Sequence, residues 1–366
     1  MKRMQRLLSV PWLMLISALL LVIVGALALY SASEGSWSPW AEQHLMRASV
    51  GFVMVLIIAI IPLKFLYNMS YVGLLAAILL LALLQIIGIG SGATRWIVIG
   101  GFNFQPSEPA KIAVILALAR YLSEIPNDRL THIVSYVPAF IILAVPFVLV
   151  LVQPDLGTSL MLLIAGVTVI ITAGLPKRWI FGGIVAVIVS IPIVWSQLYD
   201  YQKARIFTFL NPGSDEQGAG YQIIQSKIAL GSGGIFGKGF LMGSQSQLNY
   251  LPEKQTDFVF TMIGEEFGLI GNVAIIFIYF VILFSINFVA LRSQIKFGRL
   301  ACMGISMVLF SYVFVNIGMV TGLLPVVGAP LPLISYGGTA MLSMFVAFGI
   351  VVNIALHSRY ERLEHL

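Results

Sequence analysis

The sequence has few charged residues for its length. Asp, Glu, Lys and Arg make up 10% of its 366 residues, whereas 59% are hydrophobic and the mean hydropathy is +0.98. Soluble proteins carry about 25% charged residues, so the composition excludes an ordinary soluble domain and indicates an integral membrane protein. The basic residues behind the net charge of +6 are dispersed among short segments. They form no basic stripe with aromatics, which argues against nucleic-acid binding.

Cysteine is almost absent as well. The single cysteine, Cys302, lies in an apolar run, which excludes an intrachain disulfide and predicts a packed thiol. The four histidines lack the spacing of zinc ligands relative to one another or to Cys302. They are His44, His132, His357 and His365. The sequence therefore predicts no structural zinc site.

Long apolar runs are what the sequence has in abundance. A membrane-spanning helix needs about 20 predominantly apolar residues, and such runs predict an all-α polytopic protein with about ten spans. They are 11–30, 46–62, 71–90, 109–122, 133–152, 157–174, 178–197, 261–291, 299–321 and 338–357. Eight or nine spans remain an alternative, because 109–122 is short and only QPDLGT (153–158) separates two of the runs. The first run is longer than a signal-peptide core, so we interpret it as an uncleaved span.

The basic residues of the short loops predict the orientation, since cytoplasmic loops carry an excess of Lys and Arg. One side receives Lys2, Arg3, Arg6, Lys64, Arg120, Arg129, Lys177, Arg178, Arg292, Lys296, Arg299, Arg359 and Arg362. Both termini are therefore predicted to be cytoplasmic, within one integral membrane domain over 1–366. A long loop, 198–259, then lies outside, and YQIIQSKIAL (221–230) within it has the pattern of an interfacial helix.

The stretch GSGGIFGKG (231–239) resembles a phosphate-binding loop, because backbone amides of glycine-rich loops can cradle phosphates. It departs from the P-loop pattern, since Ser232 stands where the first glycine belongs and Gly239 follows Lys238 where Ser or Thr belongs. We favour a turn over a nucleotide site.

Four polar residues beside the predicted spans have two interpretations each. Asp155 is either a helix N-cap or a wall residue of an outward-facing pocket, and both can hold together. Glu108 and Lys111 are three residues apart at a helix start, which favours an ion pair over direct contact with a substrate. Arg95, beside Trp96, is either an anion-binding residue or an interfacial anchor.

Two segments predict a cavity on the outer side. PVVGAPLPLISYGG (325–338) has too many prolines and glycines for a helix, and irregular backbone near membrane depth occurs where protein or a watery cavity covers it. In PEKQTDFVF (252–260), Asp257 comes just before an apolar run that also contains Glu265 and Glu266. Asp257 is either a cap or solvated loop acid, or a carboxylate available for acid or base chemistry.

Several of these strings occur together in one known family. FQPSEPAKIA, QPDLGTS, GAGYQIIQSKIALGSGGIFGKG, LPEKQTDFVF and GMVTGLLPVVGAPLPLISYGG resemble, in order, the RodA branch of the SEDS (shape, elongation, division and sporulation) family. The resemblance implies a ten-span peptidoglycan glycosyltransferase of the bacterial inner membrane that polymerises lipid II. It also implies a class B penicillin-binding protein as partner, within the elongation machinery of rod-shaped cells. The one departure, Pro109 in PSEPAK, is compatible with a first helical turn.

The resemblance also implies roles for individual residues. It marks Asp257 as the catalytic residue and Glu108, Lys111 and Asp155 as functionally important. We expect Lys111 and Arg95 on the pyrophosphate side of the substrate. Further candidates for binding substrate or supporting the site are Lys227, Lys238, Lys254 and Ser335. A divalent cation, Mg²⁺ or Mn²⁺, could share the work, although no carboxylate cluster in the sequence indicates its site.

Two other functions remain as alternatives. A transporter that flips lipid-linked saccharides would commonly show inverted repeats and acids near the midplane, and we find no clear repeat. A non-enzymatic scaffold for a transpeptidase is not excluded by the sequence, because apolar partner surfaces resemble lipid-facing ones.

Overall fold

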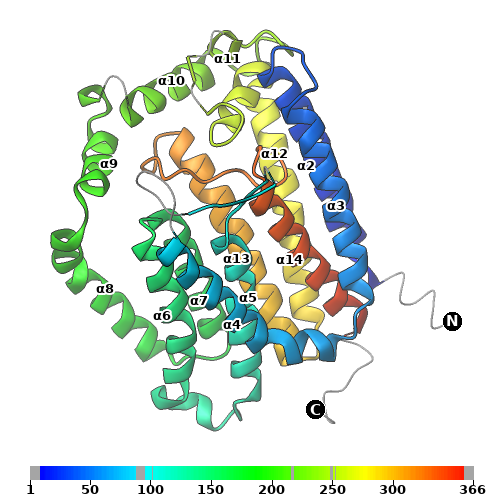
Figure 1. Cartoon of the computed structure of the whole chain (residues 1–366), viewed down its shortest axis with the longest axis vertical. Helices are drawn as coiled ribbons and strands as arrows, with labels where there is room; N and C mark the ends of the chain where they lie inside the picture. The colour runs from blue at the N-terminus through cyan, green and yellow to red at the C-terminus, as the bar shows by residue number, and fades with distance from the viewer. Residues whose placement is uncertain are drawn as a thin grey trace.

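A helix forms at each of the predicted spans in the computed structural model (Figure 1). The structure describes residues 9–87, 95–100, 102–215, 218–247, 250–251 and 253–357. The helices at the predicted spans are α2 (Trp12–Ala32), α3 (Trp40–Ile60), α4 (Leu63–Ile87), α5 (Ser107–Glu124), α6 (Val137–Val152), α7 (Leu156–Thr172), α8 (Lys177–Gln197), α12 (Val259–Arg292), α13 (Lys296–Val320) and α14 (Gly338–His357). Pro109 falls in the first turn of α5, as expected.

Within the described ranges, seven of these helical segments are long and apolar enough to cross a membrane. They correspond to α2, α3, α4, α6, α12, α13 and α14, and α7 is a shorter apolar helix. Large apolar side chains cover the outside of the bundle, including Leu56, Ile60 and Phe181. An exposed apolar surface of this extent is unfavourable in water and is the surface expected against lipid.

Two helices, α13 and α14, form the centre of the bundle. They are the most buried of the apolar helices; α14 packs against α3, and α13 packs against α5, α7 and α12. Cys302, in α13, is fully buried, which confirms the predicted packed thiol. Gly51 of α3 allows the close approach of α14, because a Cβ there would meet the Phe345 ring at 2.1 Å.

The basic turns gather at one end of the bundle, at the bottom of Figure 1. Lys296 Nζ donates to Ile125 O at 3.1 Å, which ties the start of α13 to the end of α5. Arg120 Nη1 donates to the backbone oxygens of Tyr67 and Asn68 in α4. The predicted terminal basic residues Lys2, Arg3, Arg6, Arg359 and Arg362 lie outside the described residues.

The long loop contributes helices at the opposite end, at the top of Figure 1. They are α9 (Asp200–Leu210), the short 3₁₀ turn η3 (Pro212–Ser214), α10 (Ala219–Ser232) and α11 (Ser244–Gln247). The helix predicted over 221–230 is thus present as α10, which packs against α12 and buries Ile223, Ser226 and Ala229. Ser226 Oγ lies 2.7 Å from Thr261 Oγ1 of α12. Ile224 and Ile228 of α10 are exposed, so an apolar face is free of the protein.

Helix α12 is broken at Gly268, whose φ of 69° and ψ of −163° are not helical. The glycine-rich loop after α10 supplies hydrogen bonds at this break. Lys238 N and Gly239 N donate to Glu265 O and Glu266 O at 3.0 Å each, and Leu269 N donates to Gly234 O at 2.9 Å. The loop is therefore a turn whose amides bind protein backbone, as we favoured over a phosphate site.

Two non-helical segments complete the fold beside α5 and α13. Strands β1 (Ile97–Ile99) and β2 (Phe102–Phe104) form an antiparallel pair just before α5, and the all-α prediction missed this pair. The segment 325–338 is irregular, as predicted, and Leu331, Leu333 and Ile334 within it are fully buried. Two further 3₁₀ turns, η1 (Arg129–Thr131) and η2 (Ile133–Tyr136), precede α6.

Candidate functional site

A cavity of about 260 Å³ lies among segments that are far apart in the sequence. It is lined by Arg95, Trp96, Gln105, Glu108, Asp155, Gly157, Thr158, Met161, Glu253, Thr256, Asp257, Tyr312, Val327, Gly328, Ala329, Pro330, Tyr336, Gly337, Thr339 and Ala340. Tyr312 is in the second half of α13, which begins at the basic end of the bundle. The cavity therefore lies toward the opposite end of the bundle. Four predicted site residues, Arg95, Glu108, Asp155 and Asp257, meet in it.

Asp257 lies on a tight turn immediately before α12. Glu253, at φ 57°, accepts hydrogen bonds on its carbonyl oxygen from the amides of Thr256, Asp257 and Phe258. Within the described part of the chain, the Asp257 carboxylate has no hydrogen-bond partner. Its pKa rises from 3.8 to about 6. Burial is the largest cause of this rise, the neighbouring Glu253 contributes to it, and Arg205 of α9 opposes it. A carboxylate with such a pKa is well matched to accept a proton near neutral pH.

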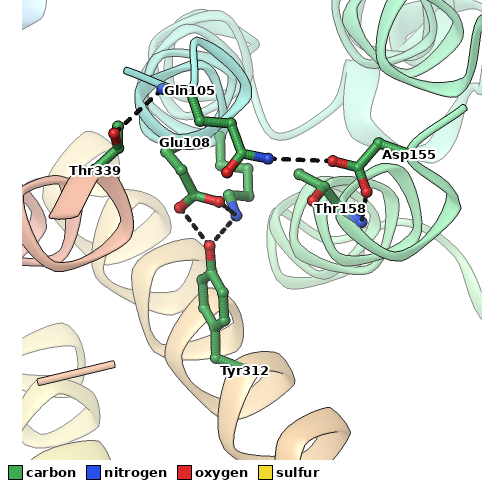
Figure 2. Close-up of polar contacts among 7 residues, drawn as sticks. Gln105, Glu108, Asp155, Thr158, Tyr312 and Thr339 are labelled. Atoms are coloured by element: carbon green, nitrogen blue, oxygen red, sulfur yellow. Dashed lines mark hydrogen bonds and ion pairs between the residues drawn. The ribbon is translucent and has the colours of Figure 1, made fainter. Parts of the chain in front are cut away.

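Glu108, on the cavity wall, forms the predicted ion pair with Lys111 (Figure 2). Lys111 Nζ lies 2.9 Å from Glu108 Oε1, and both side chains are almost fully buried. Tyr312 of α13 donates to the second carboxylate oxygen of Glu108 and contacts Lys111 Nζ. The ammonium also lies 4.2 Å from the centre of the Tyr312 ring. A buried ion pair is tolerated when additional hydrogen bonds compensate the charges, and Tyr312 provides them.

Asp155 has both of the predicted properties, since it caps a helix and lines the cavity. Its Oδ1 accepts from Thr158 N at 3.2 Å at the start of α7, and its Oδ2 accepts from Gln105 Nε2 at 3.2 Å (Figure 2). The backbone amide of Gln105 donates to Thr339 Oγ1 at 3.2 Å. Gln105, two residues before α5, thus connects the start of this helix to both α7 and α14.

Arg95 is the cation on the cavity wall. Its Nε donates to Gln153 O at 3.3 Å, and its Nη2 donates to Pro154 O. These carbonyls belong to the turn between α6 and α7, so the guanidinium is fixed beside Asp155. A guanidinium held by two carbonyls keeps further N–H donors for an anionic ligand.

The remaining candidates do not line the cavity. Lys238 pairs with Glu265 at 2.7 Å, Lys227 is exposed on α10, and Ser335 Oγ accepts from Leu331 N at 2.8 Å within the irregular segment. Lys254 is buried on the Asp257 turn, and desolvation lowers its pKa against the opposing charge of Glu34. In the described residues, no three His, Cys, Asp or Glu side chains gather to hold a metal ion.

Sequence reasoning missed several residues of the site. Gln105, Tyr312, Thr339 and Tyr336 line the cavity, and Arg205 influences Asp257. Gln105 and Tyr336 belong to the quoted motifs, so their strings contained a signal. Tyr312 had none, because a tyrosine in an apolar run has the pattern of any buried aromatic residue.

Known proteins resemble the chain over nearly its whole length. A family model for a cell cycle protein, FtsW/RodA/SpoVE, matches residues 8–360. Peptidoglycan glycosyltransferase MrdB of Escherichia coli (strain K12) is 43% identical over 351 residues, covering 94% of this chain and 93% of that protein. Stage V sporulation protein E of Bacillus subtilis (strain 168) is 35% identical over 360 residues, covering 95% and 97%.

Solved structures share the fold. One is a chain of a structure described as "Structural coordination of polymerization and crosslinking by a peptidoglycan synthase complex". Its TM-score is 0.82, and it is 28% identical to this chain, covering 96% of this chain and 98% of that one. Another is the rod shape determining protein RodA of Thermus thermophilus, with a TM-score of 0.71 and 26% identity over 96% and 98%.

Proposed function

Because the chain belongs to the FtsW/RodA/SpoVE family of cell cycle proteins, we propose that its cavity is where lipid II is polymerised into glycan strands, with Asp257 as the general base. The chain is a peptidoglycan glycosyltransferase of this family. We assign the site to this cavity because Asp257, Arg95, Glu108 and Asp155 all line it.

The reaction joins the sugar of one lipid-linked disaccharide to that of another. The acceptor hydroxyl attacks the anomeric carbon of the donor, and its proton passes to the Asp257 carboxylate. The new C–O bond forms as the bond from that carbon to the lipid pyrophosphate breaks. Pyrophosphate departs without being protonated, so no second catalytic acid is needed, unlike in glycoside hydrolysis.

Charge on the departing pyrophosphate needs cations, and the two nearest candidates differ. Arg95 keeps free N–H donors on the cavity wall, so we assign it to the pyrophosphate. Lys111 is neutralised by Glu108 beneath the cavity. We therefore assign the Glu108–Lys111 pair to shaping the cavity floor. Lys238 pairs with Glu265 and Ser335 accepts from Leu331 N, so we assign these two to supporting the surrounding structure. Lys227 and Lys254 do not line the cavity, and we assign them no contact with substrate.

We propose a topology of ten spans in the bacterial inner membrane, with both termini in the cytoplasm. The distribution of basic turns at one end and the cavity at the other supports it. Residues 1–366 then form one integral membrane domain, and 198–259 is its large extracytoplasmic loop. The lipid tails of the substrates lie against the apolar spans.

We further propose that the chain works with a crosslinking partner, a class B penicillin-binding protein, in lateral-wall elongation. The similarity to a chain of a peptidoglycan synthase complex supports this assignment. A flippase and a non-enzymatic scaffold are the competing functions. The open carboxylate of Asp257 favours chemistry over both.

Polymerisation of purified lipid II, with and without the partner, tests the proposal. An Asp257→Ala variant is expected to lose at least about 100-fold in rate, the lower range for removing a general base. Asp128→Asn is the matched control, because Asp128 is an exposed acid at the basic end. Undiminished polymer from a folded Asp257→Ala protein would refute the assignment. Absence of polymer from the wild-type protein with its partner would favour the scaffold.

A further inference from the structure

One buried asparagine connects two walls of the cavity. Asn316 of α13 is fully buried, and its Nδ2 donates to Asp257 O at 2.9 Å and to Ala329 O at 2.7 Å. The first carbonyl belongs to the turn that carries the Asp257 carboxylate. The second belongs to the irregular segment 325–338. A single amide group thus uses both of its hydrogens to join the two segments.

The Asp257 carbonyl depends on this contact. Asp257 precedes the first helical turn of α12, which begins at Val259 after Phe258. Its carbonyl is therefore outside the hydrogen-bond ladder of the helix, and Asn316 supplies a donor. A buried carbonyl without a hydrogen-bond donor is unfavourable, so this contact stabilises the turn. Tyr336 N also connects the irregular segment to this turn, because it donates to Gln255 O at 2.8 Å.

The two hydrogen bonds of Asn316 determine which backbone lies opposite the Asp257 carboxylate. Gly328 precedes Ala329, and a Cβ built at Gly328 would lie 3.4 Å from Asp257 Oδ2. The Gly328 backbone is therefore the wall that faces the carboxylate. Moving Ala329 relative to Asp257 changes this spacing directly.

Helix α13 also supports the other half of the site. Tyr312, one turn before Asn316, binds Glu108 and Lys111. Residues four apart lie on the same helix face. The same face therefore fixes the cavity floor through Tyr312 and the Asp257 turn through Asn316.

We propose that Asn316 is a positioning residue that aims the Asp257 carboxylate at the acceptor hydroxyl by joining the Asp257 turn to Ala329. It acts through backbone carbonyls and does not touch the reacting atoms. The inference rests on the proposed role of Asp257. A misplacement of about 1 Å can cost about 100-fold in rate, so the contact is expected to control turnover more than substrate binding.

The chain offers a closely matched control in Asn353 of α14. Asn353 is also fully buried, and its Nδ2 also donates to two carbonyls, Ile58 O at 2.7 Å and Ile61 O at 2.6 Å. In both asparagines, Oδ1 has no partner among the described residues. Ile58 and Ile61 are at the end of α3, far from Asp257 along the bundle. Removing either amide costs the fold the same kind of contact.

The test compares Asn316→Ala, Asn316→Ser and Asn353→Ala in lipid II polymerisation, with rates divided by folded protein from size-exclusion chromatography. We expect Asn316→Ala to lower kcat about 10- to 100-fold with little change in KM. Asn316→Ser keeps one hydroxyl donor, so its kcat should lie between those of Asn316→Ala and the wild type. If Asn316→Ala does not fold, Asn316→Ser provides the measurement. The acid limb of the pH–rate profile should also shift in both Asn316 variants. Asn353→Ala should lose thermal stability without changing kcat or the limb.

Equal effects of the Asn316 and Asn353 variants on kcat per folded protein would overturn the inference, as would a wild-type kcat and acid limb in Asn316→Ser and Asn316→Ala. Asp257→Ala is assayed alongside them. If it is inactive while the Asn316 variants behave as wild type, only the positioning role fails. If it is active, the proposed role of Asp257 fails instead.

Discussion

Two buried glutamates at the same end of the bundle each pair with a lysine, and their surroundings differ. The Glu108–Lys111 pair has side-chain exposures of 5% and 1% and borders a cavity. The Glu265–Lys238 pair has exposures of 0% and 28% and lies at the break in α12. There, Glu265 also accepts from Gln245 N at 3.0 Å and Ser244 Oγ at 3.1 Å.

This difference in surroundings distinguishes an ion pair beside a functional site from an ion pair that only stabilises the fold. The acceptors of Glu265 are used by backbone and side chains of the loop, so the cluster leaves nothing for a ligand. Glu108 and Lys111 also satisfy each other. Asp257, whose carboxylate has no hydrogen-bond partner among the described residues, opens onto the same cavity. Charge near a span end therefore predicts function only where an unsatisfied group faces open space.

The largest expected effect concerns the two lysines. Lys111→Met leaves Glu108 buried without its countercharge and should cost about 3–5 kcal/mol of unfolding free energy. Lys238→Met should cost about 1–2 kcal/mol, because Lys238 is partly solvated and Glu265 keeps hydrogen bonds to Gln245 and Ser244. Thermal unfolding in detergent measures both. Equal losses would mean that the two pairs are equivalent.

The same pair allows a double-mutant cycle on activity. Exchanging the charges, as Glu108→Lys with Lys111→Glu, should retain more polymerisation than either single change. Additive losses would instead indicate separate contacts with substrate.

A further prediction concerns the break in α12. Gly268→Ala places a Cβ 2.4 Å from Gly237 N and forces alanine into a conformation used almost only by glycine. The backbone term alone costs about 1–3 kcal/mol, and the clash adds to it. Gly182→Ala in α8 is the control, because a Cβ there meets nothing within 4 Å. An unchanged melting temperature for Gly268→Ala would show that the break is not a fixed feature.

The smallest predicted change concerns Asp257 and pH. Its pKa rises from 3.8 to about 6 on folding, so between these values the folded state binds more protons and stability falls as the pH rises. Asp257→Asn should therefore be more stable than wild type at pH 7.5, by on the order of 1–2 kcal/mol after allowance for solvent screening. The gain should vanish near pH 4. Wild-type kcat should rise with pH through about 6, and a gain in stability that is independent of pH would contradict the assignment.

The sequence predicted what depends on local patterns. Apolar runs located the spanning helices, the spacing of Glu108 and Lys111 predicted their ion pair, and the position of Asp155 predicted its cap. The prolines and glycines of 325–338 predicted its irregular backbone. Each of these follows from neighbours within one or two helical turns.

Contacts between distant segments could not be predicted. Tyr312 meets Glu108, and Asn316 meets Asp257, only because α13 packs between α5 and the turn before α12. No periodicity encodes which helices become neighbours. Lys238 illustrates the same point, since it was a candidate for the site and instead pairs with Glu265.

The break at Gly268 has a consequence for biosynthesis. The carbonyl oxygens of Gly234 and Ile235 that accept from Leu269 N and Ile270 N belong to the loop, which is made before α12. Chains fold from the N-terminus as they are synthesised, so in the proposed topology the loop has already been translocated when α12 inserts. The amides of Leu269 and Ile270, which lack helical acceptors at the break, then find the carbonyl oxygens of Gly234 and Ile235 already in place. These amides therefore do not remain unpaired while α12 enters the bilayer.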